Sequence, residues 1–136
     1  MNLRAREELF STQMRITVKR LTDAGKTVVL VYPIPETGYN IPATLPKLVL
    51  ARRNPSEFTR PENYYFRRQK FVFSVLDKLG PADKIIRIRP NQRLCDGANC
   101  IVYANGQPLY RDNDHLSLEG ADYLSDMFDP LFKPRT

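Results

Sequence analysis

The segment Tyr110-Arg-Asp-Asn-Asp-His-Leu-Ser117 contains residue types that could act as a general base. It holds the only histidine of the chain, His115, with carboxylates at Asp112 and Asp114. An imidazole works as a base when a carboxylate, hydrogen-bonded to one ring nitrogen, fixes its tautomer and orientation. Three residues of loop allow Asp112 to fold back onto the ring, whereas Asp114 is expected to point elsewhere or to cap the following helix. The spacing therefore predicts His115 as a base and Asp112 as its orienting partner.

An Asp-x-x-His pair alone is a weak signal, because a lone histidine ahead of a helix more often packs or caps. The residues before the pair predict rigid supports for it. Asn105-Gly106 lies between two apolar arms and favours a β-hairpin with a type I′ turn. Pro108 restricts the second arm to a sheet edge. That arm leads directly into Tyr110, so a hairpin is expected to present the site.

Cys95 and Cys100 enclose Asp-Gly-Ala-Asn, a spacing that suits a tight disulfide loop. Free thiols and a metal site are the alternatives for the same two residues. A zinc site would need two further ligands, and one histidine cannot supply a convincing set. We therefore expect a disulfide, which would stiffen the approach to His115, and neither a metal nor a cofactor.

The chain begins with the pattern of an α/β unit. Residues 2–21 have helical periodicity and Gly25 stops the helix. Residues 27–32 form a continuous apolar run, which predicts a parallel strand buried on both faces. Residues 33–38 end that strand with two prolines, and such ends are where α/β proteins place ligands, although the prolines could simply stop the strand. The predicted apolar stripe of the helix consists of Leu3, Leu9, Phe10, Met14, Ile16, Thr17 and Leu21.

The middle of the chain predicts a long surface loop over 37–60, with a short apolar piece at 45–51 and room for one helical turn, followed by a second helix and strand. Thr59-Arg-Pro61-Glu62 has the form of a capping box and predicts a helix from there to about Leu79. Residues 84–90 predict a shorter strand that could lie parallel to the first. The expected buried residues of this helix are Tyr65, Val72, Phe73, Leu76 and Leu79.

The end of the chain predicts one helix and a short tail. Ser117 is a good N-cap for that helix. Ala121, Leu124 and Phe128, with Leu131 as a further candidate, are expected to form its buried face, and residues 132–136 a tail. Neither a repeat nor an internal boundary interrupts the sequence, so we expect a single domain over 1–136.

Composition bounds the function classes. The 136 residues are 42% hydrophobic and 26% charged, as in a folded domain, and no apolar run approaches the roughly 20 residues of a membrane span. The net charge of +6 comes from dispersed basic residues without a recognisable nucleic-acid signature, so no specific nucleic-acid partner is expected. An anionic carbohydrate or a membrane surface fits the charge as well. The N-terminus lacks a signal-peptide core, and because a disulfide implies an oxidising compartment, we expect a leader or anchor outside this chain.

The strand followed by Pro-x-Pro-Glu, the Cys-x4-Cys loop, and the block from Leu109 through Asp-x-Asp-His-Leu-Ser-x-x-Gly-Ala121 together resemble the C-terminal part of SGNH/GDSL-type hydrolase domains. The resemblance is nearest to SGNH domains fused to membrane acyltransferase-3 proteins, which modify bacterial surface polysaccharides. It covers about residues 27–128 and is most specific from Leu94 to Ala121. It implies a flavodoxin-like three-layer α/β/α fold, incomplete at the N-terminal side.

The resemblance also implies roles for single residues. His115 would be the general base and Asp112 its orienting partner in a Ser-His-Asp triad. Cys95 and Cys100 resemble the paired cysteines often found ahead of this block. The family's serine follows Gly-Asp near the domain's N-terminus, and the serines at 11, 56, 74, 117 and 125 do not have that context. The nucleophile is therefore expected to be missing, and the chain alone inactive.

Three interpretations follow. The chain is the C-terminal part of a longer SGNH protein, a degenerate domain kept as a binding module for an anionic glycan or other polyanion, or an unrelated basic binding protein. Under the first, which we favour, the resemblance implies acyl transfer or ester hydrolysis linked to O-acylation of surface polysaccharide. The partners would be an acylated sugar or acyl donor and a membrane acyltransferase domain, on the periplasmic side of the inner membrane.

Overall fold

The computed structural model describes residues 2–132, and the chain divides into two compact units. The sheet unit comprises the residues up to Tyr32 together with Arg68–Ile88, and the loop unit comprises Pro33–Arg67 and the residues from Arg89 onward. A single domain over 1–136 stays a prediction. No helix within the described residues is long and apolar enough to span a membrane.

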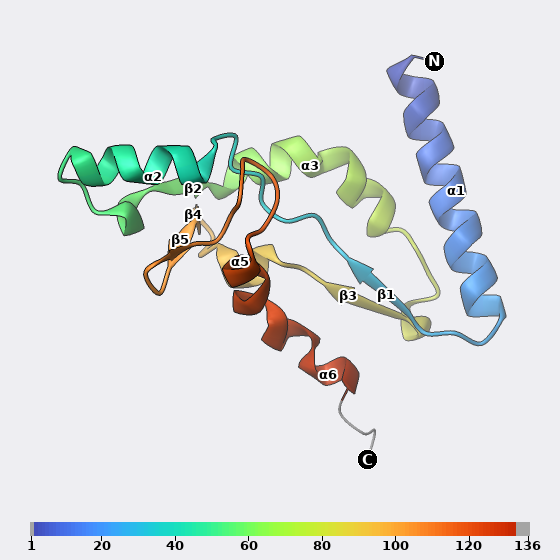
Figure 1. Ribbon diagram of the computed structural model, residues 1–136. Helices are drawn as coiled ribbons and strands as arrows, with labels where there is room; N and C mark the ends of the chain where they lie inside the picture. The colour runs from blue at the N-terminus through green and yellow to red at the C-terminus, as the bar shows by residue number, and fades with distance from the viewer. Residues whose placement is uncertain (1, 133–136) are drawn as a thin grey trace. The chain divides into compact units, whose positions relative to one another are not determined.

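The sheet unit is built on two parallel strands, β1 (Val28–Val31) and β3 (Ile85–Ile88), which run side by side in Figure 1. The ladder pairs Val28 with Ile85 and continues in step to the ends of both strands. The predicted parallel pairing of these two segments is confirmed. A short 3-10 helix, η2 (Ala82–Lys84), leads into β3.

The prediction that the first strand is buried on both faces is wrong for the structure described. Leu30 and Tyr32 are buried, but Val29 and Val31 are 38% and 51% exposed. Among the described strands β1 pairs only with β3, and apolar packing covers one of its faces. That core consists of Val18, Leu30, Tyr32, Leu76, Leu79 and Ile85.

The first helix, α1 (Leu3–Asp23), confirms the predicted helix but not its predicted stripe. Val18 and Thr22 are its buried residues, while Leu3, Phe10 and Leu21 are exposed. Of the predicted stripe, Met14 packs against the core, which α1 therefore meets with its C-terminal half. Gly25 has a φ of 76°, the left-handed conformation expected of a glycine that stops a helix.

The loop unit contains short elements joined by turns. Helix α3 (Glu62–Leu76) starts in this unit, and its C-terminal half belongs to the sheet unit. The other elements are α2 (Ile41–Leu50), η1 (Pro55–Glu57), β2 (Thr59–Pro61), α4 (Asn91–Leu94), β4 (Asn99–Ile101), β5 (Tyr103–Ala104), β6 (Gln107–Pro108), α5 (Leu118–Tyr123), η3 (Ser125–Phe128) and α6 (Asp129–Phe132). Their shared core comprises Ile41, Leu45, Leu94, Val102, Leu109, Tyr110 and Leu124.

The segment 37–60, expected as a long surface loop, contains the ten-residue helix α2. The Asn40 side chain caps it by accepting a hydrogen bond from the N–H of Ala43 at 3.0 Å. Pro42 lies in the first turn, where its missing N–H leaves no bond unmade. Pro42 is therefore compatible with a helix start, whereas Pro46 lies inside α2, where a proline supplies no N–H to the helical hydrogen bonds.

The capping box expected at Thr59 is also wrong. Thr59–Pro61 forms strand β2, antiparallel to β4, with Arg60 opposite Cys100. Helix α3 begins at Glu62 and ends at Leu76, three residues short of the predicted Leu79. A cross-strand ladder satisfies the backbone here instead of a capped helical turn.

The predicted hairpin is confirmed: β5 and β6 are antiparallel, and Asn105 and Gly106 both have positive φ, 53° and 80°, as a type I′ turn requires. The predicted C-terminal helix is instead divided into α5, η3 and α6. Leu124 is buried as expected, whereas Ala121 is exposed. Of the predicted tail 132–136, only Phe132 lies within the described residues, where it ends α6.

Candidate active site

The Asp112 carboxylate folds back onto the His115 ring, as the spacing predicts. Asp112 Oδ2 lies 2.9 Å from Nδ1 of His115. Asp112 Oδ1 accepts hydrogen bonds from the backbone N–H groups of Asp114 at 2.9 Å and of His115 at 2.7 Å. One carboxylate thus closes its own turn and holds the imidazole with its second oxygen.

The expectation that Asp114 points elsewhere is wrong. Its Oδ1 lies 3.1 Å from His115 Nδ1, so both carboxylates face the same ring nitrogen. Only the Asp112 contact has hydrogen-bond geometry. Arg111 adds a cation near the same Asp112 oxygen, with its Nε 3.9 Å from Oδ2.

Hydrogen bonds hold the pKa of the Asp112 carboxyl well below its usual range. The N–H of Asp114 has the largest effect, and loss of solvent around the carboxyl opposes it. The N–H and the ring of His115 lower this pKa further. Asp112 is therefore an acceptor at neutral pH, which places the proton of a neutral imidazole on Nδ1 and the lone pair on Nε2.

The ring is open to an incoming reactant. The His115 side chain is 61% exposed and that of Asp112 is 32% exposed. Within residues 2–132, Nε2 has no hydrogen-bond partner. The free nitrogen is the one that a general base needs, because it can accept a proton from a hydroxyl.

Backbone pairing fixes both ends of the loop that carries the pair. Tyr110 and Leu116 form an isolated antiparallel bridge, and the N–H of Arg111 donates to the carbonyl of His115 at 3.0 Å. The loop from Arg111 to His115 is therefore a tight turn whose two ends are paired with each other. The hairpin that precedes it ends two residues before Tyr110, as the sequence suggested.

The segment that follows β1 forms hydrogen bonds to the same loop. The N–H of Thr37 donates to the carbonyl of Asn113 at 2.9 Å, and the Thr37 hydroxyl lies 2.8 Å from that oxygen. The N–H of Ile41 donates to the carbonyl of Asp112 at 3.3 Å. The loop expected at the end of the first strand therefore serves the site by bracing it.

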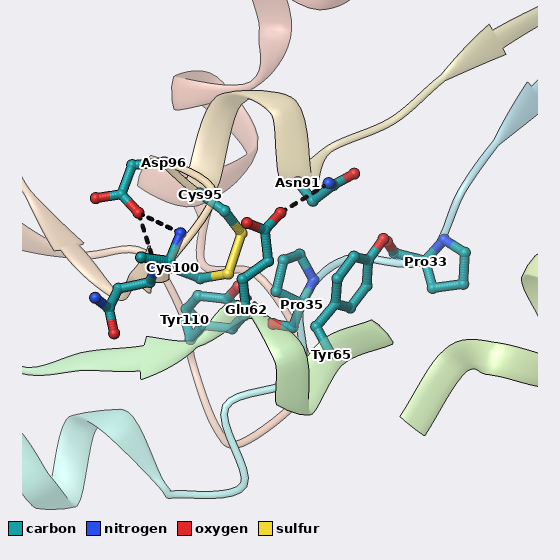
Figure 2. Close-up of a disulfide and its surroundings, with 11 residues drawn as sticks. Pro33, Pro35, Glu62, Tyr65, Asn91, Cys95, Asp96, Cys100 and Tyr110 are labelled. Atoms are coloured by element: carbon teal, nitrogen blue, oxygen red, sulfur yellow. Dashed lines mark hydrogen bonds between the residues drawn. A yellow bond between two sulfur atoms is a disulfide. The ribbon is translucent and has the colours of Figure 1, made fainter. Parts of the chain in front are cut away.

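Cys95 and Cys100 form the predicted disulfide, with a Cα–Cα distance of 4.0 Å. Figure 2 shows Tyr110 and Tyr65 near this disulfide, with Pro35 and Pro33 beside them. The hydroxyl of Tyr110 donates to the carbonyl of Pro35 and that of Tyr65 to the carbonyl of Pro33, both at 2.7 Å. Burial, and to a smaller extent Tyr65, raise the pKa of the Tyr110 hydroxyl, so it remains a donor at neutral pH.

On the far side of His115, Ser117 caps helix α5. Its hydroxyl donates to the carbonyl of Pro108 at 2.7 Å and accepts from the N–H of Gly120 at 3.0 Å. Gly120 is required by the packing, because a Cβ at this position would overlap the carbonyl oxygen of Leu109. Ser117 is therefore the N-cap that the sequence predicts, and its oxygen is already engaged.

The other four serines lie outside this loop. Ser11 is on α1 and Ser74 is on the part of α3 in the sheet unit, where its hydroxyl donates to the carbonyl of Phe71 at 2.7 Å. Ser56 is in η1 and Ser125 in η3. The structure brings Asp112 and His115 together, and none of these serines is bonded to His115 within the described residues.

The same side chains could surround a cation. Asp112, Asp114 and His115 each offer one ligand atom, and these atoms lie within 4.8 Å of one another. Nδ1 is the ring atom that faces both carboxylates, so a cation there would replace the proton shared with Asp112. Clusters of exposed acidic groups are common without a metal, and the hydrogen bonds already account for this one.

Sequence reasoning missed Thr37, Tyr110 and Asp114 as neighbours or supports of the pair. For Thr37 the signal is its place in Pro-Glu-Thr-Gly directly after a strand end. For Tyr110 it is a large polar aromatic inside an apolar arm, since a buried tyrosine needs a partner for its hydroxyl. Neither sequence signal predicts which distant backbone carbonyl the residue binds.

Comparison with known proteins places these observations in a family. The model of the SGNH domain (fused to AT3 domains) matches residues 2–130. Comparison with curated protein sequences gives no significant match.

A solved structure has a similar fold. It is the periplasmic domain of a lipopolysaccharide acetyltransferase from Salmonella ser. Paratyphi A, with a TM-score of 0.69 and 19% sequence identity. The match covers 93% of this chain and 51% of that one, so the chain spans about half the length of the solved domain. The predicted α/β fold of the SGNH type is confirmed.

Proposed function

Because the chain belongs to the family of SGNH domains that are fused to AT3 domains, we propose that Asp112 and His115 are the orienter and base of an acyl-transfer site. The reaction would be O-acylation of a cell-surface polysaccharide. The observation that carries the proposal is the 2.9 Å contact between Asp112 Oδ2 and His115 Nδ1, which leaves Nε2 free.

In this reaction a serine hydroxyl attacks the carbonyl carbon of an acyl ester. His115 Nε2 accepts the serine proton as the new C–O bond forms, and the resulting imidazolium is stabilised by the Asp112 carboxylate. His115 then returns the proton to the departing alcohol oxygen when the acyl–oxygen bond breaks. Transfer of the acyl group from the serine to a sugar hydroxyl repeats these steps with the sugar oxygen as the attacking group.

The proposal assigns the attacking serine to polypeptide other than these 136 residues. The hydroxyl of Ser117 is engaged as donor and acceptor in the cap of α5, and the other serines are not bonded to His115. The disulfide in the loop unit supports an oxidising, extracytoplasmic location for the site. An AT3 domain in the same protein is the partner that the family description suggests.

The test is O-acylation of the surface polysaccharide in the producing cell, measured by NMR of the ester groups. His115→Ala and Asp112→Asn should each lower acylation by at least about 10²-fold, since loss of the base or of its orienter has effects of this size or larger in triads. Ser117→Ala should leave the chemistry intact apart from a loss of stability. Acylation at the normal level in His115→Ala cells would exclude the proposal.

Two further measurements narrow the mechanism. The purified chain should not turn over p-nitrophenyl acetate; robust turnover that is lost in Ser117→Ala would contradict the placement of the nucleophile. Acylation should be insensitive to a metal chelator, because the proposed step uses a proton at His115 and no cation.

The second candidate is an inactive basic module that binds an anionic glycan. Its supporting observation is that no serine among the described residues is bonded to His115. Under this candidate His115→Ala would leave acylation unchanged, so the same experiment separates the two.

A further inference from the structure

Arg60 has an environment that the acyl-transfer step does not use. Its guanidinium carbon lies over two tyrosine rings, 4.7 Å from the centroid of Tyr39 and 5.2 Å from that of Tyr64. Its Nε is buried without a hydrogen-bond partner within the described residues. No carboxylate among the described residues forms an ion pair with the Arg60 guanidinium. A buried polar group that is left unsatisfied calls for an explanation, because native structures contain few.

The backbone keeps this arginine close to its rings. Arg60 lies in β2, opposite Cys100 of the disulfide. Gly38 comes so near that a Cβ there would stand 3.2 Å from the Tyr64 hydroxyl and 3.9 Å from an Nη atom of Arg60. The φ of Gly38 is 71°, so this close approach also depends on glycine's left-handed conformation.

Tyr39 is a partly exposed aromatic side chain that contacts both Arg60 and Phe58. It is 47% exposed, and its ring meets Phe58 edge-on with centroids 5.6 Å apart. A partly exposed tyrosine that is held by neighbouring groups presents a rigid aromatic surface with a polar tip. Sugar rings place their C–H groups against such surfaces, while a guanidinium stacked on the same ring can bind a carboxylate through the N–H donors at its edge.

A short chain of hydrogen bonds links this cluster to the candidate active site inside the loop unit. The Thr37 hydroxyl lies 2.8 Å from the carbonyl of Tyr39 and 2.8 Å from that of Asn113. Asn113 lies between the two residues of the catalytic pair. Tyr39 and the base are therefore braced by the same threonine.

We propose that Tyr39, Arg60 and Tyr64 form a subsite for a carboxylate-bearing sugar of the polysaccharide acceptor. The identification of this sugar as part of the acyl acceptor rests on the proposed function. Binding of the sugar does not require the acyl-transfer step. Tyr39 stacks on the sugar ring, and Arg60 supplies N–H donors to the carboxylate. The cation and its two rings act as one recognition surface.

The test uses the purified chain and trigalacturonate as the probe, with maltotriose as the neutral control, in calorimetric titrations at low salt. Wild type should bind trigalacturonate at least tenfold more tightly than maltotriose. Arg60→Gln and Tyr39→Ala should each weaken trigalacturonate binding at least fivefold, and Tyr39→Phe should stay within twofold of wild type. Arg53→Gln is the matched control, because Arg53 is exposed in the same unit and should change binding less than twofold.

A thermal melt of each variant separates loss of binding from loss of fold. Arg60→Lys keeps the charge but lacks the planar fork, so it should melt near wild type and still bind more weakly. Equal binding of the two trisaccharides, or undiminished trigalacturonate binding by Arg60→Gln, would overturn the subsite. Absence of any trigalacturonate binding at millimolar concentration would do the same.

The failure of this inference differs from the failure of the proposed function. His115→Ala should bind trigalacturonate as wild type does, because it removes the base and not the aromatic surface. If acylation in cells depends on His115 but not on Arg60, the subsite is wrong and the function stands. If trigalacturonate binds through Arg60 while His115→Ala cells acylate normally, the subsite stands and the function is wrong.

Discussion

The two units of the molecule differ in the regularity of their backbone, although both contain side chains that bind backbone carbonyls, such as Arg87 on the carbonyl of Leu79 in the sheet unit. In the sheet unit regular strands and helices dominate, and apolar side chains such as Val29 and Val31 stay exposed on β1. The loop unit contains a disulfide, and the hydroxyls of Tyr110, Tyr65 and Thr37 donate to backbone carbonyls of its irregular segments. Every residue assigned here to the candidate site lies in the loop unit. The difference teaches that the site depends on specific side-chain bonds to irregular backbone, and substitutions can test that dependence directly.

The largest expected effect comes from a methyl group at the base of α5. Gly120→Ala should destabilise the chain by about 3 kcal/mol, because the added Cβ would overlap the Leu109 carbonyl. Gly80→Ala in the sheet unit is the matched control, since its Cβ would meet only ordinary contacts and should change stability by less than about 1 kcal/mol. Urea unfolding followed by circular dichroism measures both. Equal stability of the two variants would contradict the close packing of α5.

Loss of the disulfide should be the next largest effect. The double variant Cys95→Ala/Cys100→Ala should lose about 2 kcal/mol, the loop-closure value for so short a loop. Hydrogen exchange should rise in β2 and β4 and stay unchanged in β1 and β3, which contain no cysteine. Reduction of the wild type should reproduce the loss. Faster exchange throughout the sheet unit would show that the two units do not differ in this respect.

A smaller effect is expected from a single hydroxyl. Tyr110→Phe should cost about 1 kcal/mol, because it leaves the Pro35 carbonyl without its donor inside the loop unit. Tyr103→Phe is the control: Tyr103 is half-buried in the same unit without a hydroxyl hydrogen bond among the described residues, so it should cost less than about 0.5 kcal/mol. Thermal melts compare the two. Similar losses would mean that the hydroxyl–carbonyl bond is not what braces the loop.

The smallest expected effect is the pH dependence of Asp112. Its folded pKa lies below the unfolded value of about 3.9, so its stabilising contribution is complete above that pH and is lost as the pH falls through the folded pKa. Asp112→Asn should therefore flatten the decline of stability below about pH 4, whereas Asp122→Asn, at an exposed position of α5, should not. Urea midpoints between pH 6 and pH 2.5 provide the measurement. An unchanged acid profile in Asp112→Asn would contradict the hydrogen-bonded carboxylate.

Local sequence rules were sufficient where a feature depends on neighbouring residues. The type I′ turn at Asn105-Gly106, the cap at Ser117 and the fold-back of Asp112 are all set within a few residues. The parallel pairing of the two apolar segments was also predictable, because it follows from their pattern. The family resemblance is most specific from Leu94 to Ala121, and the motifs in this segment were sufficient to predict it.

The features that failed depend on partners distant in sequence. Thr59–Pro61 satisfies a capping pattern, yet it pairs with β4 some forty residues later. The burial of the first strand could not be known without knowing which faces the helices cover. Arg60 among its tyrosines has no sequence signature either, since Tyr39 reaches it from a separate segment.

The double role of the Asp112 carboxylate has a consequence for how the site comes into being. Oδ1 shapes the turn through two backbone N–H groups, and Oδ2 aligns the ring. Folding of the turn and alignment of the imidazole are therefore one event, and the base is preorganised as soon as the loop exists. Under the proposed function no later rearrangement would be needed to align His115, so the free-energy cost of alignment would be met during folding and not in each catalytic cycle.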